Sequence, residues 1–339
     1  MHHLVPAAGL ALLAASGPSD LVSLISAPRE GLRLEREITR TQSMVSSDLS
    51  VVMGGQEVPQ GFLPDLTIEV EVKSSVAVRD AFVEPGDPFA GLARERTITD
   101  AGQSMVFAMD SGGYQGMEDA EWRMEGTTPL EGTPFLLGAD ADGAPLARWV
   151  EPESSPTDDL LEGLVPDLDL AELLPDGPIE IGARWTADAA PLGMLFQPGG
   201  DLGWDWAEGE QYLPEDPSYD NSGELELRLA ETVSADGVEL ARIEVTGTFV
   251  SVETSATTLD EVPVADGTAT DVRTTKYGVE GELLWNLALG VPHSLEIDAE
   301  GEGDQVTTRD PDQPGQDYES TMIHESSFEL RYTCRAARN

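Results

Sequence analysis

Apolar and polar residues alternate along most of this chain, the pattern of strands with one buried face and one face in water. The clearest case is Leu66-Thr67-Ile68-Glu69-Val70-Glu71-Val72, with apolar residues on one face and mostly acids on the other. The second half repeats the pattern, since Leu225, Leu227 and Leu229 alternate with Glu and Arg. This periodicity predicts antiparallel sheets.

Turn residues separate the alternating runs at short intervals. Asp142-Gly143 and Asp236-Gly237 predict tight hairpins. Asp100-Ala101-Gly102 predicts another hairpin within Thr97–Met109, and the prolines and glycine of Phe82–Leu92 predict a loop. Roughly ten to thirteen strands follow from this punctuation, which is typical of an antiparallel β-rich fold.

The stretch Thr157–Thr186 is the exception, because its leucines recur at spacings of three and four. Such a stripe predicts an amphipathic helix. Pro166 removes a backbone donor and therefore divides the stripe into two short helices, over 157–165 and 167–174. We expect this helical insertion, residues 157–175, to pack as a lid on the sheet.

These patterns predict a mostly β (α+β) protein whose antiparallel sheets form a half-barrel or sandwich with a short central helical insertion. An N-terminal β-rich half would span 28–156, and a C-terminal β-rich half 176–333. Residues 1–17 resemble a secretory signal peptide, with an apolar run that ends in small residues. Since no later run approaches the length of a transmembrane helix, we expect an exported, soluble protein in the periplasm or outside the cell.

The charge of the chain limits its partners. The sequence carries 64 acidic and 19 basic residues, a net charge of −45. Such a field repels phosphate backbones and anionic membrane surfaces, so we expect no nucleic-acid partner. A saline habitat and a bound divalent cation both explain the acidity, and calcium is the one cofactor that we consider. The single cysteine, Cys334, excludes an intramolecular disulfide.

The loop Asp201–Asp220 concentrates aromatic and acidic side chains. Aromatic faces stack on sugars or cations, and loops often carry binding residues. The alternative is that the aromatics anchor the loop to the sheet while the acids keep it solvated. The candidate ligand-binding residues are Trp204, Trp206, Tyr212 and Tyr219, and the candidate metal ligands are Asp201, Asp205 and Glu208.

Signatures of catalysis are weak. Asp110-Ser111-Gly112 matches the active-site triplet of aspartic peptidases, but that chemistry needs two carboxylates and the chain has no second triplet. Only His293 and His324 follow the amino-terminal segment, and the sequence contains neither a G-x-S-x-G nor an H-E-x-x-H pattern. We expect a non-enzymatic protein and keep a hydrolase built from scattered carboxylates as a remote alternative.

The run Leu174-Pro175-Asp176-Gly177-Pro178-Ile179, followed by Gly182 and Trp185, has the form L-P-x-x-P-[IV]-x-x-G-x-x-W. This run resembles a family of exported bacterial β-rich proteins of unknown function, as does the later stretch Gly281–Gly290. The resemblance implies export and a sheet-plus-helix fold and no known activity, and this chain lacks a lipobox cysteine. At the level of fold alone, that pattern looks like carriers that hold an acyl chain in an open half-barrel.

We therefore expect a protein that binds an apolar ligand or a partner protein. A lipid or small apolar ligand would lie between the sheet and the helical insertion, against Leu160, Leu164 and Leu168. The alternative is a cation- or glycan-binding surface protein that uses the Asp201–Asp220 loop.

Overall fold

One antiparallel sheet of 14 strands dominates the computed structural model, so the mostly β prediction is confirmed. Its main path runs β10-β12-β13-β14-β15-β16-β2-β4-β5-β6-β11. The structure describes residues 21–26, 28–114, 118–154, 156–164, 170–197, 199–207, 215–235, 237–258, 268–309 and 318–337. The predicted signal peptide, residues 1–17, lies outside them.

Eight strands of 17 to 21 residues build most of the sheet, far longer than the usual five or six. They are β2 (Arg33–Met53), β4 (Thr67–Val83), β5 (Ala93–Asp110), β12 (Glu215–Ala235), β13 (Val238–Thr258), β14 (Thr268–Asn286), β15 (Val291–Arg309) and β16 (Tyr318–Ala336). The short strands are β1 (Leu21–Val22), β3 (Gln56–Glu57), β6 (Ala120–Thr127), β7 (Phe135–Ala139), β8 (Pro145–Trp149), β9 (Ile179–Glu180), β10 (Arg184–Asp188) and β11 (Asp205–Trp206).

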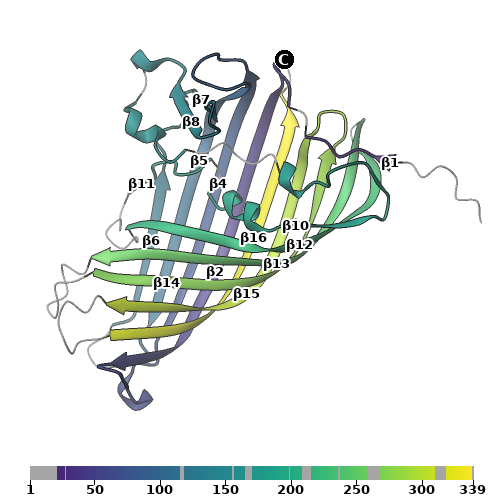
Figure 1. Ribbon diagram of the computed structural model, residues 1–339. Coiled ribbons are helices and arrows are strands. Elements are labelled where there is room, and N and C mark those ends of the chain that lie inside the picture. The colour runs from purple at the N-terminus through teal and green to yellow at the C-terminus, as the bar shows by residue number, and fades with distance from the viewer. Residues whose placement is uncertain are drawn as a thin grey trace, which may run out of the picture.

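The two predicted β-rich halves are parts of the same sheet. The last long strand, β16, pairs with the first, β2, from Ala336 opposite Leu34 to Tyr318 opposite Met53. The strands β10 and β11 end the path and do not pair with each other, so the structure is an open half-barrel. In Figure 1, β12–β15 cross in front of β2, β4, β5 and β6, which shows that the sheet curves strongly.

Residue alternation gives the curved sheet a wet convex face and a drier concave face. On β15, for example, Glu296, Asp298 and Glu300 are exposed, whereas Leu295 and Ile297 between them are fully buried. Glycines let neighbouring strands come close on the inner face of the bend. A side chain at Gly247 would collide with the backbone of β12, and one at Gly281 would collide with the backbone of β15.

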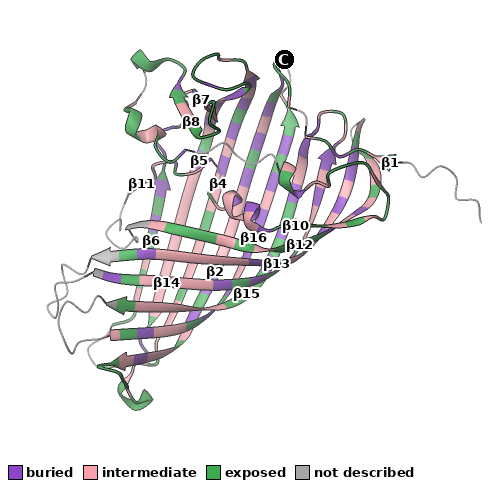
Figure 2. Ribbon diagram, viewed as in Figure 1, coloured by how far each residue is buried: buried purple, intermediate pink, exposed green. Residues whose placement is uncertain are grey.

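Two large apolar clusters fill the upper part of the concave face, where Figure 2 shows most of the buried positions. The first lies mainly on β12–β16 and is covered by Leu170, Leu173, Leu192 and Leu195. The second lies on β4, β5, β7 and β8 and is covered by Leu164 and Leu202. Each cluster buries large side chains completely, including Trp285 in the first and Phe135 in the second.

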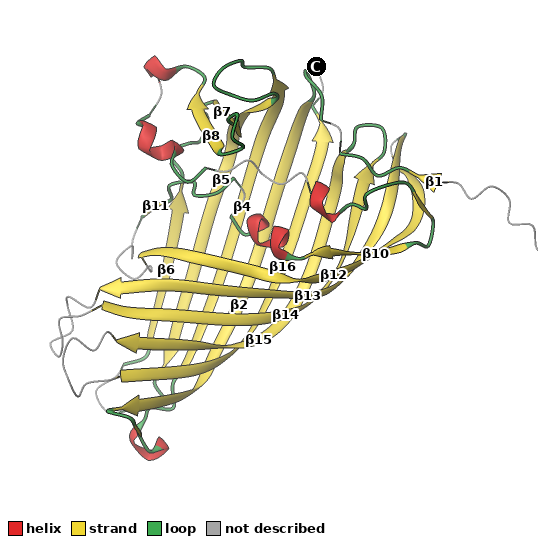
Figure 3. Ribbon diagram, in the orientation of Figure 1, coloured by secondary structure: helices red, strands yellow, loops and turns green. Residues whose placement is uncertain are grey.

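The predicted pair of helices is replaced by isolated 3₁₀ turns, η3 (Asp158–Leu161) and η4 (Ala171–Leu173), while residues 165–169 lie outside the described part. Figure 3 shows the helical turns gathered at one end of the strands, apart from η1 (Gln60–Phe62). The remaining turns are η2 (Pro152–Ser154) and η5 (Ala190–Leu195). Leu170 and Leu173 pack into the first cluster, and Trp185 Nε1 on β10 donates to the Leu173 carbonyl at 2.8 Å.

Two predicted hairpins had different outcomes. The Asp142-Gly143 turn is confirmed between β7 and β8, where Asp140 Oδ1 accepts from the Asp142 and Ala144 amides. The hairpin within Thr97–Met109 is wrong, because β5 runs through it as one strand. The register shifts by one residue near Thr99, which forms a bulge and not a turn.

A buried ion cluster joins β2, β4 and β5 near the apolar clusters. The Asp80 carboxylate is fully buried and receives two hydrogen bonds from Arg96, at 2.8 and 3.0 Å. Arg36 and Arg94 lie 3.2 and 3.9 Å from the same carboxylate. Burial alone would raise the pKa of Asp80, but the charges of Arg96 and Arg36 outweigh it and hold this pKa below its ordinary value.

We expect Asp80→Asn to destabilise the fold by about 3–5 kcal/mol, because it leaves buried arginines without their carboxylate. Urea unfolding followed by tryptophan fluorescence measures the loss. Glu71→Gln on the convex face of the same strand is the matched control, since among the described residues Glu71 forms an ion pair with the exposed Lys73 alone. We expect its unfolding free energy to stay close to that of the wild type.

The pH dependence checks the same assignment. A depressed folded-state pKa contributes stability that is present above the unfolded carboxyl pKa of about 3.9 and is lost as the pH falls through the folded value. The stability gap between wild type and Asp80→Asn should therefore stay constant above about pH 5 and narrow in acid. A gap that is unchanged down to acid unfolding would show that Asp80 is not held ionised by the arginines.

Candidate functional site

The lower part of the concave face carries apolar side chains that none of the described core clusters includes. Their positions alternate in register with the buried Val76 and Val78, so they project from the same side of β4 and its neighbours. All seven are only partly buried. We call them the concave strip: Ile68, Val70, Val72, Met105, Phe107, Met109 and Trp122.

The strip is continuous across three strands. Val72 lies opposite Met105, Val70 opposite Phe107, and Ile68 opposite Met109. Phe107 and Trp122 are in ring contact, with centroids 4.9 Å apart. From Val72 to Ile68 the strip extends about 13 Å along the strands, at roughly 3.3 Å per residue. A surface of this length accommodates a substantial part of an alkyl chain, and each buried methylene group contributes about 0.8 kcal/mol.

A polar row separates the concave strip from the core clusters. Its members are Arg40 on β2, Ser74 on β4 and Gln103 on β5, which lie opposite one another in the sheet. The row continues onto β6 at Gly126, which lies opposite Gln103. The ring of Trp206 packs directly against Gly126, next to where a side chain of this residue would project. Along β4 and β5 the concave face therefore passes from buried core through one polar row to a partly exposed apolar surface.

Arg40 is the unusual member of this row. Its Nε is buried and has no hydrogen-bond partner among the described residues. Its guanidinium carbon lies 5.3 Å from the centre of the Phe196 ring, a cation–π contact. Burial lowers the pKa of Arg40, and the nearby Tyr219, Tyr277 and Glu253 oppose that shift. Arginine nevertheless stays protonated, so this position holds a positive charge in poorly solvated surroundings.

Polar side chains on the opposite wall of the half-barrel lie close to this row. Gln42 Nε2 donates to the Tyr277 hydroxyl at 3.3 Å, and that hydroxyl is 2.9 Å from Ser326 Oγ. Further along the wall, Arg273 donates to Glu253 at 3.0 Å. The two walls therefore meet through hydrogen bonds as well as through the apolar clusters.

Tyr219 lies opposite Glu253 on this wall. Although 45% of its surface is exposed, desolvation by its concave surroundings disfavours the phenolate, and the Glu253 carboxylate does so further. Together they raise the pKa of Tyr219 to about 12. Tyr219 is thus a neutral hydrogen-bonding group at physiological pH.

The aromatic residues predicted from the Asp201–Asp220 loop do not form one site. Trp204 packs against the second apolar cluster, Trp206 lies on β11 beside Gly126, and Tyr219 is on β12. Tyr212 lies outside the described residues. The described loop aromatics therefore lie on or against the sheet at separate places.

The remaining predicted residues also separate. Leu164 is buried in the second cluster and Leu160 packs against it, while Leu168 lies outside the described residues. Asp201 Oδ1 accepts from the Gly203 amide, and Asp205 lies on β11. Glu208 is outside the described residues, and no group of three possible metal ligands occurs within them.

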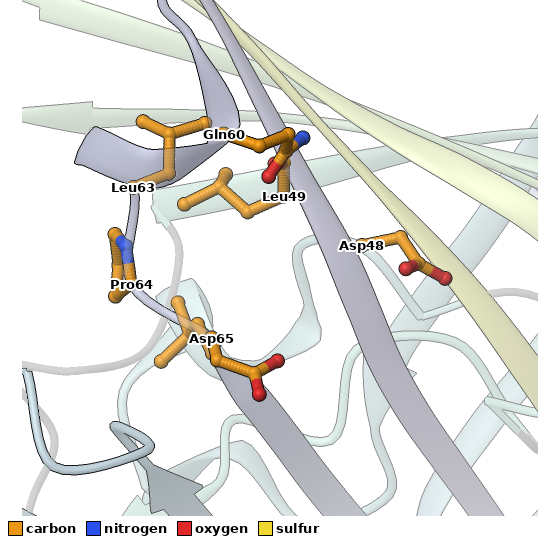
Figure 4. A pocket seen from close by; sticks show the side chains of 7 residues that line it. Asp48, Leu49, Gln60, Leu63, Pro64 and Asp65 are labelled. Atoms are coloured by element: carbon orange, nitrogen blue, oxygen red, sulfur yellow. The ribbon is translucent and has the colours of Figure 1, made fainter.

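A shallow hollow lies at the end of the molecule where β2 turns toward β4 (Figure 4). Its lining residues are Asp48, Leu49, Gln60, Leu63, Pro64, Asp65 and Leu66. Gln60 Nε2 donates to the Leu49 carbonyl at 3.1 Å, which ties η1 to β2. Two carboxylates and one engaged amide offer no set of groups for catalysis.

The other chemical candidates have local structural roles. Asp110 Oδ1 accepts from the Gly112 amide at 2.8 Å, so the peptidase-like triplet forms a turn. His324 Nε2 lies 2.8 Å from Thr275 Oγ1, the distance of a nucleophile–base pair. However, His324 is 1% exposed and its Nδ1 has no partner among the described residues, so this pair lacks both access and an orienting group.

Comparisons with known proteins identify no family. No family model matches the chain, and no curated protein matches it. Among solved structures, it is similar to OccK7 (OpdD) of Pseudomonas aeruginosa, with 7% identity, TM-score 0.18, and coverage of 90% of this chain and 99% of that one. Two secretins also match: GspD of E. coli K12 (9% identity, TM-score 0.16, 91% and 51% covered) and InvG of Salmonella (10%, 0.14, 91% and 64%).

The chain thus spans about half of the GspD chain and 64% of the InvG chain. These similarities are too low to carry an argument about function. In the part of the chain that the structure describes, no helix has the length and apolar character needed to cross a bilayer.

Absorbance titration of the tyrosines tests the assignment of Tyr219. We expect a phenolate component with a pKa of about 12 in the wild type and its loss in Tyr219→Phe. Tyr114→Phe, which removes a tyrosine that is 42% exposed, is the control and should retain that component. If the late component persists in Tyr219→Phe, the desolvated environment belongs to another tyrosine.

Proposed function

We propose that this protein binds an apolar, lipid-like ligand on the concave face of its half-barrel. The observation that carries the proposal is the concave strip, seven large apolar side chains that remain partly exposed beside two filled cores. Contiguous apolar patches of this kind mark ligand or partner sites more often than scattered surface residues do.

The location differs from the one that the leucine stripe predicts. The space beneath η3 is filled by the second cluster, in which Phe135, Leu130 and Ile98 are completely buried. The concave strip lies beyond this filled region, on the lower parts of β4, β5 and β6. A ligand there would contact the sheet directly, and the covering turns would close only the upper end.

The acidity of the convex face supports the concave face as the binding surface for an apolar ligand. Its exposed positions are rich in acids, for example Glu296, Asp298, Glu300 and Glu302 on β15. These carboxylates keep the outer surface in contact with water and would repel one another if covered by an apolar partner. The Thr275–His324 pair is enclosed, and no described group orients the imidazole through Nδ1. This arrangement is consistent with a binding protein that is not an enzyme.

A charge placed in the concave strip should weaken the binding of a neutral probe. We expect Met105→Asp to weaken binding of hexadecanol to the delipidated protein at least tenfold, about 1.4 kcal/mol, because the carboxylate must be desolvated beneath the chain. Ser104→Asp is the matched control, since the adjacent residue faces the convex side opposite Lys73. Binding is measured by equilibrium dialysis, with circular dichroism to confirm that both variants are folded.

Two results would contradict this function. Hexadecanol that fails to bind the wild type, together with no lipid in extracts of the purified protein, would remove it. A concentration-dependent dimer that Met105→Asp dissociates would show instead that a second copy covers the concave strip.

A further inference from the structure

We infer that Arg40 is the recognition site for an anionic head group, so that the ligand is a single long alkyl chain ending in a carboxylate or phosphate. This inference rests on the proposed function and specifies its ligand. Its basis is the juxtaposition of two features on one face: a partly exposed apolar strip and a poorly solvated cation one row beyond its end.

Arg40 forms no ion pair within the described structure, and its buried Nε finds no acceptor there. The ring of Phe196 supplies the defined contact to the guanidinium. A buried charge is stable when it is both paired and hydrogen-bonded. An aromatic ring attracts a cation less strongly than a carboxylate or phosphate does, so the Phe196 contact alone does not meet this need.

Glu253 and other acids of the concave face are engaged elsewhere. Glu253, whose field reaches Arg40, accepts a hydrogen bond from Arg273 at 3.0 Å. Asp271 accepts from Thr307 and from Gln305. Asp80, further up the concave face, is held by Arg96 and Arg36. The protein therefore provides carboxylates for its other concave-face arginines near this site and leaves Arg40 to be matched by an external anion.

The position of Arg40 matches the geometry of an amphiphile. Arg40 and Gln42 are two residues apart on β2, a separation of about 6.6 Å along the concave face. Gln42 lies opposite Val72, the first residue of the concave strip. A head group at Arg40 would therefore place the following methylene groups on Val72, Met105 and the strip beyond them. Ser74 and Gln103 flank the same row and add hydrogen-bonding groups.

The experiment compares ligands that share a 16-carbon chain and differ in the head: palmitate, hexadecyl phosphate, hexadecanol and hexadecyltrimethylammonium. Equilibrium dialysis with the delipidated full chain gives each dissociation constant. We expect the wild type to bind at least one of the two anions at least tenfold more tightly than hexadecanol, and the cation least tightly. The two anions distinguish a carboxylate from a phosphate as the source of the charge.

Variants assign the preference to Arg40. Arg40→Gln should lose the advantage of the anions and leave the affinity for hexadecanol within about twofold, while Arg40→Lys should keep much of that advantage because it retains the charge. Arg79→Gln removes an arginine from the convex face, where 69% of the side chain is exposed, and should change nothing. The wild-type ligand series and Arg40→Lys decide the question even where Arg40→Gln does not fold.

The outcomes separate the two proposals. Hexadecanol binding as tightly as both anions to the wild type would overturn the role of Arg40 and leave the apolar site intact. An anion preference that survives in folded Arg40→Gln would likewise overturn it. Failure of all four compounds to bind would overturn the proposed function itself.

Discussion

The pairing of β16 with β2 is the interaction on which the rest of the structure depends. It connects strands that are about 300 residues apart in sequence and spans the length of both. Without it, the chain would form two open sheets, each with an uncovered apolar face and two unpaired edges. With it, one sheet is wide enough to curve over its own inner face, and long strands can bury that face at one end.

Curvature explains why both polar and apolar groups occupy the concave face. The core clusters and the covering turns fill the upper end, so polar groups there must be paired, as Asp80 is by its arginines. Towards the lower end the covering elements stop, and the same alternation continues into the partly exposed concave strip. Arg40 lies where these two regimes meet, and this boundary is where an amphiphilic ligand would place its head.

Local periodicity revealed much of the fold. The alternation over Leu66–Val72 and the Asp142-Gly143 turn were sufficient for β4 and for the β7–β8 hairpin. The Asp100-Ala101-Gly102 turn signal failed because a bulge absorbs the extra residue without reversing the chain. The leucine spacing after Thr157 suggested an amphipathic helix. Spacing alone does not show that these leucines pack against two separate clusters.

That division also explains the short 3₁₀ turns: Leu164 packs into the second cluster, whereas Leu170 and Leu173 pack into the first. One helical face could not serve both. The site was hidden for a related reason, since Arg36 and Arg40 alternate with Leu34 and Ile38 as inward residues of β2. Arginines at inward positions of an apolar alternation are a sequence signal for such a site. The residues that these arginines contact depend on the strand register, which the sequence alone does not show.

Crystallising the protein with 16-bromohexadecanoic acid and recording anomalous diffraction at the bromine edge tests most directly the proposal that an anionic amphiphile binds the concave face. We predict a bromine peak over the concave strip, near Met109 or Trp122, with carboxylate density at Arg40. A bromine peak on the convex face or beneath η3, or a concave strip covered by the protein's own chain, would contradict it.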